Sequence, residues 1–247
     1  MVDALRESIM RAFYIAEKDA KIYFFKWPNI TFGLLLPAII YLAFSIGRTD
    51  EIVLTMPGLV AMAALFGAGA IESVALPLER AKGTFERLLV APISLTTILV
   101  GKALAGFFFG LVLSMGYVLF ILPLSGVAVA NLLLFAFGVI LSAFSFAALG
   151  VCISAPFGDI PEAMPPATLL RVAMVFLGGV FLPVAEMPKF LRFIARFFPL
   201  TYAVEILQQA TTGQIIVQAI LVDAIVLILF SVFFFVAGVF IIKKTLR

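Results

Sequence analysis

The side chains that enzymes most often use for acid–base and metal chemistry are scarce in this sequence. It has no His and a single Cys, Cys152, which lies in an apolar run. His-based triads, His-ligated metals and an intrachain disulfide are therefore excluded. The Gly101-Lys102 pair is no phosphate-binding loop, because Thr96 stands where the G-x-x-x-x-G-K-[ST] motif requires Gly. We expect a chain that binds no metal or cofactor, hydrolyses no nucleotide and is not itself an enzyme.

Two carboxyl groups stand inside long apolar runs and are the strongest candidates for functional polar groups. They belong to Glu72 and Asp223. An ionised carboxylate within a membrane is costly and usually faces protein or water. Glu72 has two interpretations, because it either lines a transport pathway or forms a structural ion pair with Arg171. Asp223 either lines the pathway or lies near the membrane surface, and the residues alone leave these alternatives open.

The composition indicates what kind of protein holds these groups. Hydrophobic residues make up 64% and charged residues 13% of the 247 residues, and the mean hydropathy is +1.22. Ordinary globular domains contain roughly 45–50% and 25% of these classes. A membrane helix needs about 20 apolar residues, and six stretches qualify: 30–47, 56–78, 95–122, 127–155, 167–184 and 215–242. The sequence therefore predicts an all-α polytopic membrane protein with six transmembrane helices.

The distribution of Lys and Arg predicts the orientation of these spans, because cytoplasmic loops carry an excess of them. Of the 17 basic residues, 13 fall on one side and four on the other. The 13 are Arg6, Arg11, Lys18, Lys21, Lys26, Arg80, Lys82, Arg87, Lys102, Arg171, Lys243, Lys244 and Arg247; the four are Arg48, Lys189, Arg192 and Arg196. Both termini are therefore expected in the cytoplasm. The net charge of +3 reflects this loop bias rather than nucleic-acid binding.

Two segments outside the spans have amphipathic patterns. Apolar residues between Leu5 and Ala20 recur at helical spacing among charges, which predicts a helix lying on the inner leaflet. Between Pro188 and Pro199, aromatic and aliphatic residues alternate with basic ones, which predicts a short helix at the outer leaflet. We expect a single domain over residues 1–247, with an interfacial segment at 1–29, a six-span core at 30–242 and a cytoplasmic tail at 243–247.

The stretch between the second and third spans is the most informative. Gly83 and Thr84 can begin a helix, with the Thr84 hydroxyl as its cap. Pro92 ends the helix, because the residue before a proline avoids the helical region. The product is a short cytoplasmic helix with an apolar side (Phe85, Leu88 and Leu89) and two charged residues (Glu86 and Arg87). Such a compact mixed helix predicts a docking surface for a cytoplasmic partner.

In three places the sequence resembles the type-2 permeases of ATP-binding-cassette (ABC) exporters, and the likeness covers essentially the whole chain. The first motif is Glu79-Arg80-x-Lys82-Gly83-Thr84-x-Glu86-x-Leu88-Leu89-x-x-Pro92-x-Ser94. The second is Gly178-Gly179-Val180-Phe181-Leu182-Pro183, followed by Met187-Pro188. The third is Phe198-Pro199-Leu200-Thr201-Tyr202-Ala203-Val204-Glu205.

The resemblance implies a multi-pass permease subunit of an exporter in the plasma (inner) membrane of a bacterium or archaeon, in contact with membrane lipids. Its partners would be a separately encoded cytoplasmic ABC ATPase, which holds ATP and Mg²⁺, and a second permease copy or a related permease. The implied ATPase-coupling residues are Glu79, Arg80, Lys82, Gly83, Thr84, Phe85, Glu86, Arg87 and Leu88. Short re-entrant helices would cap the outer side of the pathway, with Pro183, Pro188, Pro199, Thr201, Tyr202 and Glu205 in that segment.

Two other classes of protein compete with this interpretation. An ion-gradient-driven secondary transporter would use Glu72 and Asp223 as coupling carboxylates. Such folds often contain internal repeats, and none is evident in this sequence. An intramembrane enzyme would need clustered Asp, His or Ser/Lys groups near one leaflet, whereas the acidic residues of this chain are scattered.

Overall fold

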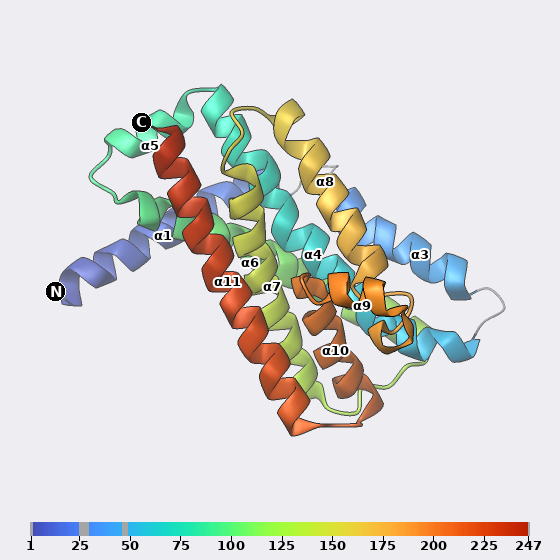
Figure 1. The fold of residues 1–247 in the computed structure, drawn as a ribbon. Helices are drawn as coiled ribbons and strands as arrows, with labels where there is room; N and C mark the ends of the chain where they lie inside the picture. Colours follow the sequence, from blue (N-terminus) through green and yellow to red (C-terminus); the bar gives the residue numbers. More distant parts are fainter. Residues whose placement is uncertain (1, 25–29, 46–48, 247) are drawn as a thin grey trace.

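The computed structural model of the chain describes residues 2–24, 30–45 and 49–246, and these residues form helices and turns with no strand (Figure 1). This confirms the predicted all-helical class. The helices are α1 (Val2–Tyr23), the π-helical turn η1 (Thr31–Leu35), α3 (Leu36–Ser45), α4 (Thr49–Ala81), α5 (Thr84–Val90), α6 (Leu95–Ser125), α7 (Leu132–Ser154), α8 (Ile160–Leu177), the 3₁₀ turn η2 (Val184–Glu186), α9 (Lys189–Ala195), α10 (Pro199–Thr212) and α11 (Val217–Thr245).

Five of the described helices are long and apolar enough to cross a membrane. They are Thr55–Ala81 within α4, and α6, α7, α8 and α11. The first predicted span, 30–47, corresponds to η1 and α3, where the apolar helical part Gly33–Ala43 is shorter. The count of six spans therefore stays a prediction. Gly47 at the end of that span lies outside the described residues, as do Lys26, Arg48 and Arg247.

Helix α8 differs most from its predicted span, because it begins and ends seven residues earlier than the apolar window 167–184. The Asp159 side chain caps its first turn by accepting a hydrogen bond from the backbone N–H of Glu162 at 3.0 Å. Pro161 occupies the first turn, where its missing N–H costs nothing. The chain leaves the helix at Gly179, whose φ of +85° suits glycine. Pro161 therefore lies in the first turn of α8, and Pro165 and Pro166 lie inside the helix.

Helix α4 is the centre of the bundle, and small residues allow its neighbours to approach closely. It packs against α6, α7, α8 and α10. A Cβ added at Gly106 of α6 would lie 2.6 Å from the Ala68 carbonyl oxygen, and one at Gly110 would lie 2.7 Å from the Ala68 Cβ. On the other side, a Cβ at Gly150 of α7 would lie 3.0 Å from the Gly69 oxygen. The small residues Gly106 and Gly110 of α6 thus serve packing within the chain.

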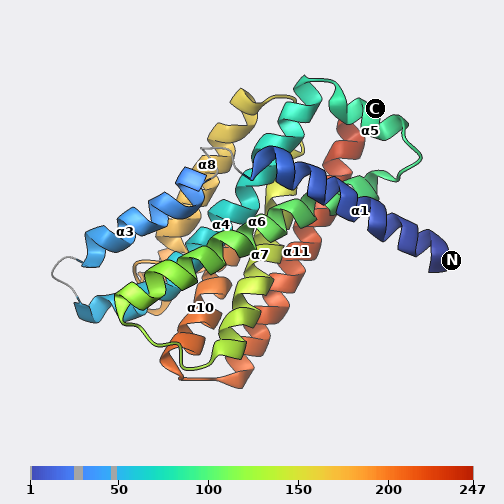
Figure 2. The same ribbon diagram turned by 180° about the vertical axis from the view of Figure 1, so that it is seen from behind.

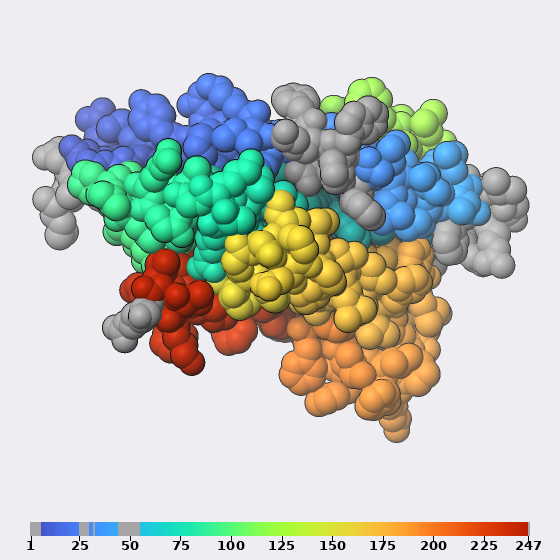
Figure 3. All heavy atoms as spheres, turned by 90° about the horizontal axis from the view of Figure 1, so that it is seen from above, coloured from blue at the N-terminus to red at the C-terminus, as the bar shows by residue number. Residues whose placement is uncertain are grey.

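Different helices and connections lie at the two ends of the bundle (Figures 1 and 2). Helix α5, the α7–α8 connection and the C-terminal end of α11 gather at one end, which we call the α5 end. Helix α1 packs along α6 and reaches the same end, where the α4–α5 segment, the start of α8 and the end of α11 lie near one another (Figure 3). The α6–α7 and α10–α11 connections lie at the opposite end.

Residues 178–216, here called the α9–α10 segment, join α8 to α11. Helix α10 has 14 residues, which span about 21 Å and cannot cross a hydrocarbon core of about 30 Å. It is buried on most sides and packs against α4, α7 and α11. The Asn131 N–H donates to the Ala210 carbonyl at 2.9 Å, which ties the C-terminal end of α10 to the start of α7.

Candidate functional site

The predicted short helix between the second and third spans is present as α5. It begins after Gly83, which is in the left-handed conformation (φ +65°), and ends before Ala91, which is extended and precedes Pro92. Glu86 and Arg87 are exposed. Val90 is 88% exposed. The helix therefore presents two opposite charges and one apolar side chain to its surroundings at the α5 end.

The other side of α5 is anchored in the bundle. Phe85 is fully buried in a cluster with Leu76, Ile98 and Ile242, which belong to α4, α6 and α11. The Arg80 guanidinium lies 5.5 Å from the centre of the Phe85 ring. It donates to the carbonyls of Ala155 at 2.8 Å and Phe157 at 3.0 Å, in the α7–α8 connection. Helix α5 is thus tied to α4, α6, α7 and α11.

These contacts correct three details of the predicted coupling surface. Phe85 points inward and cannot be part of an exposed surface. Thr84 is not the cap of α5: Gly83 holds that position, and the Thr84 hydroxyl donates to the Glu79 carbonyl at 3.2 Å. The Glu79 side chain is buried, so it is not part of the exposed coupling surface. Lys82, Gly83, Thr84, Glu86 and Arg87 are exposed, and Leu88 is half-buried.

Glu79 instead belongs to a largely buried charge cluster that joins α1, α4 and α6. We define it by Lys18, Asp19, Glu79 and Lys102, of which only Lys18 is partly exposed. The Lys102 Nζ lies 2.8 Å from Glu79 Oε2 and 3.1 Å from Asp19 Oδ2. The Lys18 Nζ lies 2.5 Å from Glu79 Oε1 and 2.9 Å from Asp19 Oδ1. Two ammonium groups and two carboxylates therefore balance one another, as buried charges must.

Lys102, counted above among the basic residues of the cytoplasmic side, is fully buried. Its partner Asp19 was missed, although a signal existed. Ala12, Ala16, Asp19 and Tyr23 follow one another at helical spacing, and all four are buried against the bundle. A charged residue on the apolar stripe of a helix indicates a buried partner of opposite charge.

Tyr23 completes the α1 side of this cluster. Burial, together with the nearby Glu79 carboxylate, raises the pKa of Tyr23 to about 12. A low-polarity environment and a neighbouring negative charge both disfavour the phenolate. The Tyr23 hydroxyl therefore stays neutral at physiological pH.

The predicted ion pair between Glu72 and Arg171 is absent from the described part of the chain. Arg171 donates to the Gly69 carbonyl at 2.7 Å and to the Ser73 hydroxyl, which joins α8 to α4. Glu72 is fully buried, and among the described residues neither of its carboxyl oxygens has a hydrogen-bond partner. The charged groups that act on it are those of Lys102, Asp19, Glu79 and Lys18, so it lies near the charge cluster.

Thr201, Tyr202 and Glu205, which were predicted to lie in the outer segment, make contacts that join α9 to α10. Arg196 Nη1 forms an ion pair with Glu205 Oε2 at 2.8 Å, and the Tyr202 hydroxyl donates to the Arg196 carbonyl at 2.8 Å. The buried Thr201 donates to the Ala195 carbonyl at 2.6 Å. Partial burial lowers the pKa of Arg196, but the hydrogen bond from Arg196 to Glu205 outweighs burial and holds this pKa above its usual value.

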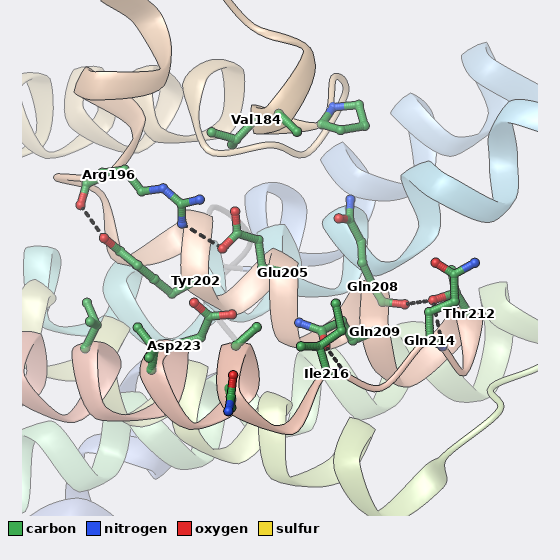
Figure 4. Close-up of a pocket in the computed structure, with 16 residues that line it drawn as sticks. Val184, Arg196, Tyr202, Glu205, Gln208, Gln209, Thr212, Gln214, Ile216 and Asp223 are labelled. Atoms are coloured by element: carbon green, nitrogen blue, oxygen red, sulfur yellow. Dashed lines mark hydrogen bonds and ion pairs between the residues drawn. The ribbon is translucent and has the colours of Figure 1, made fainter. Parts of the chain in front are cut away.

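The prolines of this segment mark helix starts. Pro183 precedes η2, Pro188 precedes α9 and Pro199 is the first residue of α10. A proline tolerates these positions because its missing N–H would have no partner there. A cavity of about 930 Å³ lies between this segment and the N-terminal half of α11, and Glu205 and Asp223 line it (Figure 4).

These features define a class: a polytopic helical membrane protein with a braced short helix at one end and a buried helical segment at the other. Residues 9–212 match the family model described as ABC-2 type transporter. This match covers most of the chain, so the chain belongs to the ABC-2 transporter membrane family, as its motifs predicted.

Two named relatives agree with this assignment. Escherichia coli (strain K12) has a relative named "Probable multidrug ABC transporter permease YbhR", which is 28% identical over 159 residues, covering 62% of this chain and 42% of that relative. This chain thus spans less than half of that relative's length. Rhizobium leguminosarum bv. viciae has "Nodulation protein J", which is 27% identical over 217 residues, covering 82% of this chain and 80% of that relative.

Proposed function

We propose that this chain is the membrane-spanning permease subunit of an ABC exporter, driven by a separately encoded ABC ATPase that holds ATP and Mg²⁺. The single observation that carries this proposal is α5. It exposes Glu86, Arg87 and Val90, while Phe85 and Arg80 fix it to four helices of the bundle. An exposed helix with a rigid base can receive a push from a partner and pass it to the membrane helices.

The proposed topology is one permease domain with six spans and both termini in the cytoplasm of a bacterium or archaeon. Helix α1 and the C-terminal end of α11 would lie on the same side of the membrane as α5. This is supported by Ile15 of α1 and Ile242 of α11, which lie in the same buried cluster as Phe85. η1 and α3 would be the first span, and α9 and α10 would be re-entrant on the outer side. A second copy or a related permease would complete the pathway among membrane lipids.

Family membership favours ATP drive over the ion-gradient alternative. That alternative requires coupled carboxylates, yet Glu72 lies beside the charge cluster and Asp223 lines the cavity near α10. The two groups therefore belong to different sites in the chain. Transport by the purified chain without an ATPase, abolished in Glu72→Gln, would restore the gradient-driven interpretation.

The test is recovery of an ATPase with the tagged chain from native membranes in mild detergent, with bound proteins identified by mass spectrometry. Glu86→Lys and Arg87→Glu each reverse an exposed charge of α5 and should reduce the recovered ATPase several-fold. Glu186→Lys is the matched control, because it makes the same charge change at an exposed residue of η2, away from α5. It should leave recovery unchanged.

Equal ATPase recovery with both α5 variants would show that α5 is not the docking helix. A reproducible preparation without any ATPase would contradict the proposed function itself. Recovery of a second permease with the chain would identify the partner that completes the pathway.

A further inference from the structure

The cavity near α10 is large enough for a drug-sized molecule. Its volume is about 930 Å³, at the upper end of the roughly 300–1,000 Å³ typical of small-molecule sites. η2 and α10 form one wall, and the N-terminal half of α11 forms the other (Figure 4).

One wall of the cavity borders the surface that faces lipid. Val222 lines the cavity and is 57% exposed, and Leu221 and Ile225 beside it on α11 are also exposed. These apolar side chains lie on a candidate membrane span, so their exposed surface suits contact with hydrocarbon. A ligand can therefore enter from the membrane, which selects molecules that partition into lipid.

The charges that line the cavity do not balance. They are Arg196, Glu205 and Asp223, so two carboxyl groups face one guanidinium (Figure 4). Arg196 is committed, because its guanidinium pairs with Glu205 at 2.8 Å and lies 5.6 Å from the centre of the Tyr202 ring.

Asp223 is the carboxyl group in excess. Its residue is 4% exposed, on a span where an uncompensated carboxylate is costly. A cation placed between Asp223 and Glu205 would restore neutrality. An anion would add a second like charge, and with a neutral ligand Asp223 would have to hold a proton for the lining to be neutral.

We propose that this cavity binds a monovalent organic cation with an apolar body, and that Asp223 and Glu205 balance its charge. The apolar body would lie against Val184, Val222 and Val226, and the amide of Gln208 would face the polar head (Figure 4). This inference rests on the proposed function, because it names the class of substrate that the exporter would receive from the membrane. Binding itself can be measured on the chain alone.

The experiment uses two probes of the same shape and opposite charge, tetraphenylphosphonium and tetraphenylborate. The full chain is placed in phosphatidylcholine nanodiscs, and binding is measured by equilibrium dialysis, with binding to empty nanodiscs subtracted. Tetraphenylphosphonium should bind saturably and tetraphenylborate should not. Asp223→Asn, which keeps the shape of the side chain, should weaken tetraphenylphosphonium binding by about tenfold or more.

Two further variants keep the result interpretable. Asp223→Glu retains the charge and should bind within a few-fold of the parent chain. Ala219→Phe fills the cavity from α11 without changing any charge and should weaken binding as well. Gel filtration and helical circular dichroism would check that each variant is folded.

Equal binding of both probes, or unchanged binding in Asp223→Asn, would overturn the proposal. Displacement of tetraphenylphosphonium by maltose, a neutral hydroxyl-rich probe, would also overturn it in favour of a glycan site. Measuring ATPase recovery with the Asp223→Asn variant distinguishes a failure of the cavity proposal from a failure of the proposed exporter function. An unaltered ATPase with no cation binding contradicts only the cavity assignment, whereas cation binding without any ATPase contradicts only the proposed function.

Discussion

Replacing Lys102 should destabilise the protein strongly, because its charge holds two buried carboxylates from other helices. The Lys102 and Asp19 side chains have no exposed surface, and the Glu79 side chain is 5% exposed. Lys102→Met keeps most of the apolar stem but leaves both carboxylates with Lys18, whose side chain is 38% exposed. Breaking a buried ion pair costs about 3–5 kcal/mol. Because Lys18 compensates in part, we expect a loss of about 3 kcal/mol in the free energy of unfolding.

The assay is unfolding by sodium dodecyl sulfate in mixed micelles, followed by circular dichroism. The double variant Lys102→Met/Asp19→Asn leaves Lys18 facing Glu79, one cation for one anion. Its loss should therefore be smaller than the sum of the two single losses by about 1 kcal/mol or more. Lys18→Met should cost less than Lys102→Met, because the Lys18 side chain is 38% exposed whereas the Lys102 side chain has no exposed surface. A loss below about 1 kcal/mol for Lys102→Met, the value of an exposed pair, or strict additivity in the double variant would refute this reasoning.

Three further predictions use the same unfolding assay. Phe85→Ala should lower the free energy of unfolding by about 3–5 kcal/mol, because it empties a fully buried site. Glu86→Lys should change this free energy by less than about 0.5 kcal/mol and reduce only ATPase recovery. Equal losses of stability in the two variants would contradict the anchoring role of Phe85. Gly106→Ala should cost about 1–3 kcal/mol, because its Cβ would lie 2.6 Å from the Ala68 oxygen, whereas Gly116→Ala, whose Cβ would lie 3.9 Å from its nearest neighbour, should be neutral. The pKa of Tyr23 is raised from 10.0 to about 12 in the folded protein. The stability that this shift contributes is fully present below the pKa of the unfolded chain and is lost as the pH rises from 10 to about 12. The Tyr23→Phe variant should therefore lose less stability than the parent chain over this pH range, and an equal loss in both would place Tyr23 in water.

The sequence predicted the elements whose signals are local. Apolar runs located the long helices, and Gly83 with Pro92 bounded α5. The error in α8 was also local, because the averaged hydropathy of residues 167–184 outweighed the Asp159 cap and the first-turn Pro161. Cap and proline signals define where a helix begins, whereas hydropathy defines only which residues tolerate a membrane.

The charge cluster could not be derived in the same way, because its members come from three helices. Asp19 and Lys102 are 83 residues apart, and only the packing of α1 along α6 brings them together. Considered on its own helix, Lys102 resembles any basic residue near the end of a span. The same limit applies to Arg171 of α8. Its partners are Gly69 and Ser73 of α4, and not the acidic Glu72 of that helix. Complementary charge identifies residues that can pair, but helix packing decides which of them do.

On the proposed function, the packing of α4 determines how a displacement of α5 can travel. Arg80 and Phe85 hold α5 to the bundle, so α5 cannot tilt without moving the end of α4. Helix α4 packs closely against α6 and α7, because a Cβ added at Gly106 would lie 2.6 Å from the Ala68 oxygen and one at Gly150 would lie 3.0 Å from the Gly69 oxygen. At its other end, a Cβ on Gly58 would lie 2.7 Å from the Val180 Cα in the α9–α10 segment. A displacement of α5 would therefore reach the α9–α10 segment through the close packing of α4.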